Sequence, residues 1–146
     1  MKILLQRVNR ASVTVAGELV GQIDRGLLLL VGFGRNDTEP DLVRARDKII
    51  NLRLFSNENN KLDRSLLDIG GAILAIPQFT LYGQTRKGRR PDFTDSLDPD
   101  LAETHFDSFI QLLHQTTVIN VKSGVFGAEM AVSLVNDGPF TLMLEY

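Results

Sequence analysis

The sequence predicts an α+β fold in which a curled, mostly antiparallel β-sheet, barrel-like in shape, carries two main helices packed on it. Segments with strand patterns fill the first and last thirds of the 146 residues, and two other segments have helical spacing with clear starts. Strand-like and helix-like segments do not alternate regularly, which disfavours a doubly wound parallel sheet. No repeat or linker-like composition divides the chain, so we expect a single domain over residues 1–146.

The first third is expected to consist mainly of strands. Residues 3–8, 12–15 and 18–23 have strand patterns, and Ala16-Gly17 marks a hairpin between the second and the third. Residues 27–33 are apolar without alternation, which is typical of a strand buried on both faces.

Two helices have recognisable starts. Thr38 with Asp41 three positions later resembles a capping box, with Pro40 tolerated in the first turn. Asp98 followed by Pro99 is typical of an N-cap and a first-position proline. Each start leads into one apolar stripe that should lie on the sheet, made by Leu42, Ala45, Ile49 and Leu52 in the first helix and by Ala102, Phe106, Phe109 and Leu113 in the second.

The remaining strands are expected in the second half of the chain. A pair of glycines precedes a strand over residues 72–81, and further strands are expected over residues 118–122, 130–135 and 140–145. The last of these alternates as a half-buried strand should, because one face holds Phe140, Leu142 and Leu144.

Composition narrows the possible functions. The absence of cysteine removes disulfides, thiolate nucleophiles and Cys-ligated zinc, and it is compatible with a reducing cytosol, so we expect a cytoplasmic protein. The longest apolar run, residues 27–31, is far shorter than the roughly 20 residues of a membrane helix, so no membrane association is expected. A net charge of -2 argues against a generally cationic nucleic-acid binder. Any RNA contact should be local, at the one concentrated basic run, Arg86-Lys87-Gly88-Arg89-Arg90.

Side-chain catalysis has few candidates. His105 and His114 are nine residues apart on one expected helix, which at 100° per residue places them on nearly opposite faces. No metal-ligand spacing or evident carboxylate pair occurs, so neither a metal nor a cofactor is expected. Gly32-Phe33-Gly34 lacks the third glycine of a dinucleotide-binding motif, and a turn explains it.

Two short stretches are more informative. They are Pro77-Gln78-Phe79-Thr80-Leu81 and Asn136-Asp137-Gly138-Pro139-Phe140-Thr141, and each looks like a strand end that presents backbone to a small ligand. Glycine allows close approach of a main chain to a ligand and proline fixes φ, so Gly138-Pro139 can form a stiff backbone wall. Thr80 has a conspicuous hydroxyl but no evident base, which favours an orienting role over covalent attack.

The two stretches resemble the signature motifs of the D-aminoacyl-tRNA deacylases, usually written Ser-Gln-Phe-Thr-Leu and Asn-x-Gly-Pro-Val-Thr, and the similarity extends along nearly the whole chain. The resemblance implies hydrolysis of the ester of D-aminoacyl-tRNA by a homodimer, without cofactor, DNA or membrane. It implies a cis Gly138-Pro139 bond whose carbonyls enter the neighbouring subunit's pocket. It also implies that the RNA's own 2′-hydroxyl, or a water that it positions, attacks the ester. The site residues are then Gln78, Phe79 and Thr80 for catalysis, Gly138 and Pro139 for substrate, and Arg86, Lys87, Arg89 and Arg90 for tRNA.

The sequence departs from this pattern at two positions. Pro77 stands where most of these deacylases have Ser, and Phe140 replaces the usual Val. A related subfamily that clears L-alanine mischarged on a threonine tRNA also begins with proline, but it continues Gln-Ala-Thr where this chain has Gln78-Phe79-Thr80. That subfamily, a non-catalytic tRNA-binding module and a small-molecule esterase are the alternatives.

Overall fold

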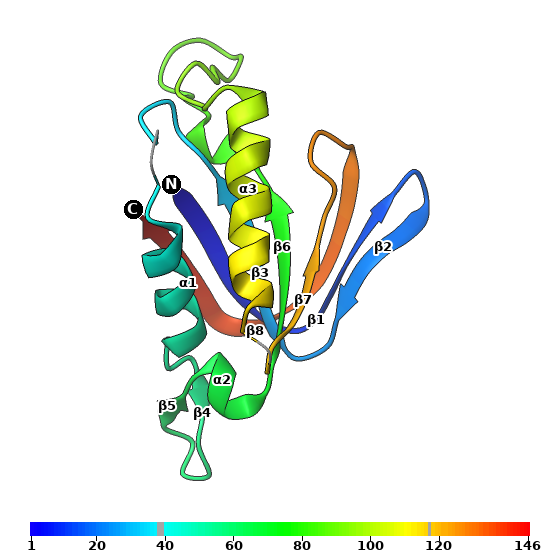
Figure 1. The fold of residues 1–146 in the computed structure, drawn as a ribbon, viewed down its shortest axis with the longest axis vertical. Coiled ribbons are helices and arrows are strands. Elements are labelled where there is room, and N and C mark those ends of the chain that lie inside the picture. The colour runs from blue at the N-terminus through cyan, green and yellow to red at the C-terminus, as the bar shows by residue number, and fades with distance from the viewer. Residues whose placement is uncertain (38–39, 117) are drawn as a thin grey trace.

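The computed structural model describes residues 1–37, 40–116 and 118–146 (Figure 1). Its main sheet has six strands in the order β2-β1-β3-β6-β7, with β8 paired to β1 off this path. β1 pairs antiparallel with β2, β3 and β8, whereas β6 pairs parallel with β3 and β7. The sheet curls into a nearly closed shape, which confirms the expected α+β class with a curled sheet. The bounds are β1 Lys2–Val15, β2 Glu18–Ile23, β3 Gly26–Gly32, β6 Ala72–Pro77, β7 Asn120–Ser123 and β8 Met130–Glu145.

Two strands are longer than expected. Residues 3–8 and 12–15 belong to one strand, β1, because β8 pairs with it along nearly its whole length while β3 and β2 follow one another on its other edge. Residues 130–135 and 140–145 are likewise one strand, β8. The register changes between Gln6↔Thr141 and Val8↔Asn136, so four residues of β8, 137–140, stand opposite the single residue between them in β1. Gly138-Pro139 therefore lies in a bulge inside a strand.

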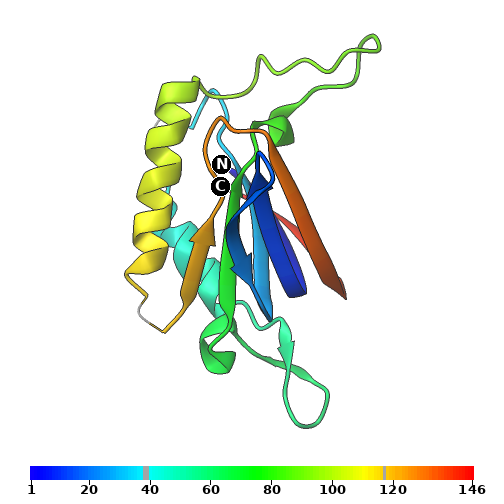
Figure 2. The same cartoon turned by 90° about the vertical axis from the view of Figure 1, so that its right-hand side faces the viewer.

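Both main helices are present and cover one face of the sheet (Figures 1 and 2). In α1, Leu42–Asn51, the N-cap is Asp41, whose side chain accepts a hydrogen bond from the Arg44 N–H at 2.9 Å. The expected capping residue Thr38 lies outside the described residues, and Pro40 precedes the cap instead of lying in the first turn. In α3, Pro99–His114, Asp98 is the N-cap and proline is the first residue, as expected. The apolar stripes of both helices face the core.

Four short elements were not expected. They are β4 Phe55–Ser56, β5 Leu62–Arg64, the one-turn helix α2 Leu66–Ile69 and the 3₁₀ helix η1 Phe79–Tyr82. The expected strand over residues 72–81 ends at Pro77, because its parallel neighbour β3 ends at Gly32 and offers no further ladder. The chain turns there into η1, which carries most of the first motif.

Apolar side chains fill both faces of the sheet. Leu27, Leu29 and Val31 of β3 belong to the cluster under the helices, and Leu28 belongs to the cluster on the opposite face, which confirms a strand buried on both sides. Arg7 is an exception, because it is a charged residue only 8% exposed. Within the described residues, no helix combines the length and the apolar character that a membrane crossing requires.

Candidate active site

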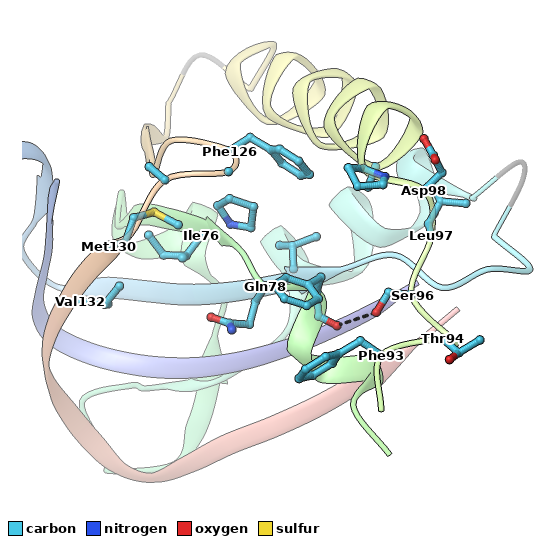
Figure 3. Close-up of a pocket in the computed structure, with 17 residues that line it drawn as sticks. Ile76, Gln78, Phe93, Thr94, Ser96, Leu97, Asp98, Phe126, Met130 and Val132 are labelled. Atoms are coloured by element: carbon cyan, nitrogen blue, oxygen red, sulfur yellow. Dashed lines mark hydrogen bonds between the residues drawn. The ribbon is translucent and has the colours of Figure 1, made fainter. Parts of the chain in front are cut away.

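A cavity of about 710 Å³ opens beside the first motif (Figure 3). Its walls come from the end of β6, the start of η1, residues 93–98, the first turn of α3 and residues 126–132. Most lining side chains are apolar, among them Ile76, Leu97 and Phe126. The cavity thus combines an apolar body with the few polar groups that its rim supplies, which is typical of a small-molecule site.

β6 and η1 deliver the first motif to this cavity. The N–H of Gln78 donates to the carbonyl of Val31 at 2.7 Å, so the residue is fixed where the parallel ladder ends. Gln78 and Phe79 line the cavity, whereas Thr80 is the next residue along the turn and accepts a hydrogen bond from the Gln78 side-chain amide. The three residues assigned to catalysis are therefore close together.

Phe79 also contacts Phe93 and Ser96, two residues that sequence reasoning did not single out. Phe79 is 56% exposed, and its ring packs edge-on against Phe93 with 5.1 Å between centroids. Its carbonyl accepts a hydrogen bond from the Ser96 hydroxyl at 3.2 Å (Figure 3). The available sequence signal for these two residues was their position in the polar segment between the basic run and the start of the second helix.

The cavity offers shape and hydrogen bonds but little acid–base chemistry. Asp98 is the only ionisable residue among those that line it, and its carboxylate caps α3 by accepting from the Asp100 N–H at 3.1 Å. His105 packs against Phe33 with 5.5 Å between ring centroids, and His114 is exposed in the last turn of α3. Among the described residues, no group of three His, Cys, Asp or Glu side chains could hold a metal ion.

The second motif lies away from this cavity in the same chain. Gly138 and Pro139 are exposed, are joined by a cis peptide bond and do not line the cavity. Asn136 fixes the start of the bulge, because its amide donates to the carbonyl of Arg7 at 2.9 Å and to that of Phe140 at 3.3 Å. The structure therefore does not bring the two motifs together within one chain.

Arg7 holds the bulge from beneath. Its Nε lies 2.8 Å from the Asp137 carboxylate and donates to the Asp137 carbonyl at 3.3 Å, and Nη2 donates to the Gly138 carbonyl at 3.5 Å. Nη1 donates to the carbonyl of Leu54, and the guanidinium lies 4.2 Å from the ring centroid of Phe140. Sequence reasoning missed this residue, although an arginine two positions after Leu5 interrupts the alternation of core residues in β1.

The basic run lies in a loop that extends away from the helices and the sheet (Figure 2). An isolated bridge between Gln84 and Asp92 closes the loop at its base, with N···O distances of 2.7 and 2.9 Å. Its four cations are exposed, and none forms an ion pair within the described part of the chain. They do not line the cavity, and Phe93 connects their loop to it. The cations are Arg86, Lys87, Arg89 and Arg90.

Sequence comparisons with known proteins indicate one family. A family model described as D-Tyr-tRNA(Tyr) deacylase matches residues 4–145. The D-aminoacyl-tRNA deacylase of Bacillus cytotoxicus is 52% identical over 145 residues, which cover 99% of each chain. That of Halothermothrix orenii is 50% identical and is matched over 97% of its length and 99% of this chain.

Solved structures share the fold. One described as c-Myc DNA Unwinding Element Binding Protein superposes with a TM-score of 0.90 at 42% identity, covering 100% of this chain and 99% of that chain. A probable eukaryotic D-amino acid tRNA deacylase superposes with a TM-score of 0.86 over 98% of this chain and 97% of its own. At 21% identity, the second similarity shows the fold alone.

Proposed function

The chain belongs to the D-Tyr-tRNA(Tyr) deacylase family and is a hydrolase acting on ester bonds, and from that premise we propose that it releases D-amino acids from D-aminoacyl-tRNA while rejecting L-aminoacyl-tRNA by shape. The observation that carries this proposal is a large cavity whose rim presents backbone and amide groups and has no free side-chain base among its lining residues.

Such a site suits an ester that is already activated. The N–H groups of Phe79 and Thr80 begin η1, so neither has a hydrogen-bond partner within that helix. Either can donate to the oxyanion that develops on the ester carbonyl, and one such donor is typically worth about 2.7 to 4 kcal/mol in the transition state. In this mechanism the RNA's 2′-hydroxyl, or a water that it positions, attacks the carbonyl. Gln78 orients the terminal adenosine or the amino group.

The separation of the two motifs supports a homodimer. Gly138 and Pro139 are exposed on the bulge of β8, a 16-residue strand whose pairing partner in the described sheet is β1 alone. A long strand with an open edge is normally covered in a native protein. In the proposed dimer, this bulge of one protomer reaches the cavity of the other and completes it.

Chiral selection follows from this arrangement. A pocket that grips the α-amine and the ester carbonyl leaves two directions at Cα, one for hydrogen and one for the side chain. Backbone of Gly138-Pro139 fills the direction that an L side chain needs, so a D side chain enters and an L side chain clashes. Glycine has no side chain to clash, so glycyl-tRNA is also expected to be cleaved.

The basic loop supplies the contacts to the rest of the tRNA. Lys and Arg side chains can position a phosphate backbone without reading its sequence. Because the net charge of the chain is -2 and these cations form its one concentrated basic run, we assign them to tRNA and expect no DNA partner. The proposal places this activity in the cytoplasm and in a single domain spanning residues 1–146.

Four substrates test the function. The purified protein is incubated with D-tyrosyl-tRNA, L-tyrosyl-tRNA, glycyl-tRNA and L-alanyl-tRNA(Thr), and ester loss is followed against a protein-free control. We expect cleavage of the D-tyrosyl and glycyl esters and survival of the L-tyrosyl ester. Preferred cleavage of L-alanyl-tRNA(Thr) would assign the chain to the related deacylase, and binding without cleavage of any ester would make it a tRNA-binding module.

A further inference from the structure

The turn that carries the first motif is short and not buried. η1 has four residues, none of them buried, and its N-cap Gln78 forms no side-chain capping bond. The Leu81 N–H donates to the Gln78 carbonyl at 3.3 Å and the Gly83 N–H donates to the Thr80 carbonyl at 2.9 Å, so both of these bonds involve a residue just outside the turn. Because 3₁₀ helices have poor hydrogen-bond geometry, contacts from outside must fix its position.

Tyr82 provides such a contact at the end of η1. Its hydroxyl donates to the Asp37 carboxylate at 2.8 Å, and its ring packs so closely on Gly34 that a Cβ there would lie 2.3 Å from a ring atom. Asp37 is itself fixed, because it accepts from the Gly34 N–H at 2.6 Å and pairs with the α-ammonium of Met1 at 2.5 Å. The hydroxyl of Tyr82 is thus tied to the segment that follows β3.

The other end of η1 contacts the segment that contains Ser96, and this segment pairs with the one that follows β3. The Phe79 carbonyl accepts from Ser96, and Ser96 forms an isolated bridge with Gly34. The Arg35 N–H donates to the Asp95 carbonyl at 2.8 Å within the same pairing. The two segments that hold η1 therefore form one connected support.

The charge states suit a strong hydrogen bond between Tyr82 and Asp37. Burial raises the pKa of the Tyr82 hydroxyl, and the hydrogen bond to Asp37 raises it further. Burial alone would raise the pKa of Asp37, but hydrogen bonds from the Met1 ammonium, the Gly34 N–H and Tyr82 outweigh it and lower that pKa. At neutral pH a protonated phenol donates to an ionised carboxylate, which is the stronger kind of hydrogen bond.

We propose that Tyr82 and Asp37 are positioning residues. They hold η1, and with it the N–H groups of Phe79 and Thr80, in a fixed position beside the cavity. Neither residue lines the cavity, so both act through the turn. The kinetic consequence rests on the proposed deacylase function. A misplacement of about 1 Å by a change far from the reacting atoms can cost about 100-fold in rate.

Steady-state kinetics of Tyr82→Phe test the proposal, because this variant keeps the ring and removes the hydroxyl. We expect kcat on D-tyrosyl-tRNA to fall about tenfold, with KM within about twofold of wild type, since oxyanion donors act in the transition state. Tyr146→Phe is the matched control, because Tyr146 is also partly buried and its hydroxyl forms no hydrogen bond within the described residues. The control should leave kcat unchanged.

Amide hydrogen exchange gives a readout that does not depend on activity. In Tyr82→Phe the amides of Leu81 and Gly83 should exchange at least about fivefold faster than in wild type and in Tyr146→Phe, because η1 opens more often. If wild type cleaves no D-aminoacyl-tRNA, the proposed function fails, but the exchange measurement still shows whether the hydrogen bond between Tyr82 and Asp37 holds η1 in place. Unchanged exchange, or faster exchange with unchanged kcat, overturns the positioning role.

A double-mutant cycle separates this role from general destabilisation. Asp37→Ala and Tyr82→Phe should each lower kcat. The double variant should be no slower than the slower single variant, because both changes break the same hydrogen bond between Tyr82 and Asp37. Multiplication of the two effects would show independent roles and overturn the inference. Gly34→Ala provides a second route, since it displaces the Tyr82 ring and keeps the hydroxyl; it should lower kcat in the same way.

Discussion

The guanidinium of Arg7 binds Asp137 through both its side chain and its backbone, with Nε 2.8 Å from the carboxylate and 3.3 Å from the carbonyl oxygen. Arg7 stands opposite the bulge that contains Gly138 and Pro139, so a buried cation supports an exposed segment of backbone. The position of the second motif thus depends on a residue about 130 positions earlier in the chain.

Arg7→Ala should destabilise the protein. The change removes three donors from a buried position and leaves the carbonyls of Leu54, Asp137 and Gly138 without them. We expect the free energy of unfolding in urea to fall by roughly 2 to 3 kcal/mol. Arg53→Ala is the control, because its ion pair with Asp63 is exposed and should contribute less than about 0.5 kcal/mol. Equal losses for both variants would contradict this reading of Arg7.

Thr80→Ala should keep most of the activity. Thr80 bonds to the Gln78 amide and has no ionisable group among its described hydrogen-bond partners, so the mechanism does not use it as a nucleophile. We expect kcat for D-tyrosyl-tRNA within about tenfold of wild type, whereas loss of a true nucleophile costs on the order of 10⁵ to 10⁶. Single-turnover kinetics distinguish these magnitudes, and an inactive Thr80→Ala would restore the covalent mechanism.

The basic loop should contribute to tRNA binding and not to chemistry. Arg89→Ala with Arg90→Ala should raise KM for D-tyrosyl-tRNA and lower the slope of its salt dependence by about one per lost phosphate contact. On D-tyrosyl-adenosine, which lacks the tRNA body, the same variant should behave as wild type. Lys61→Ala is the control, because it removes an exposed cation from the loop between β4 and β5, elements that lie at the opposite end of the molecule from the basic loop (Figure 1). An equal loss on both substrates would place these arginines in the chemical step.

Asp37 should contribute to the acid sensitivity of the fold. Its pKa in the folded protein lies below its ordinary value of 3.8, so its contribution to stability is complete above that value and is lost as the pH falls through the folded pKa. Asp37→Asn should therefore be less stable than wild type at pH 7, and the difference should shrink below about pH 4. Urea midpoints at pH 7 and pH 3 measure this, with Asp107→Asn as an exposed control. A difference as large at pH 3 as at pH 7 would contradict the assignment.

The helices could be predicted because their signals are local. The caps and apolar spacing of α1 and α3 lie within the segments themselves, and the stripe from Ala102 to Leu113 is buried as expected. The lengths of β1 and β8 could not be predicted in this way. Each is set by pairing with the other, and the bulge opposite Arg7 lets the strand continue through a Gly-Pro pair that the local sequence assigns to a turn.

The site was predictable in residue type but not in geometry. The first motif could be recognised from Gln78 to Thr80, but the cavity beside it is closed by residues 93–98 and 126–132, which tertiary packing brings there. Arg7 and Tyr82 act through carbonyls and carboxylates far away in the sequence. Their residue types alone gave no sign of those partners.

Pro139→Ala provides the variant for testing selection across the dimer. The change loosens the proposed backbone wall, so its homodimer should cleave L-tyrosyl-tRNA as well as the D ester. Phe79→Pro provides the complementary variant, because it removes an N–H from its own cavity and keeps its bulge intact. In a mixed dimer, the intact cavity of the Pro139→Ala protomer faces the intact bulge of its partner.

The most direct test is the rate of L-tyrosyl-tRNA cleavage per Pro139→Ala protomer as a growing excess of Phe79→Pro protein is exchanged into the dimers. If Gly138-Pro139 of one protomer screens the substrate of the other, L cleavage falls toward the wild-type level while D cleavage continues. The double variant Phe79→Pro, Pro139→Ala, added in the same excess, should leave L cleavage unchanged. L cleavage that stays constant whichever protein is added would contradict selection by a partner's backbone.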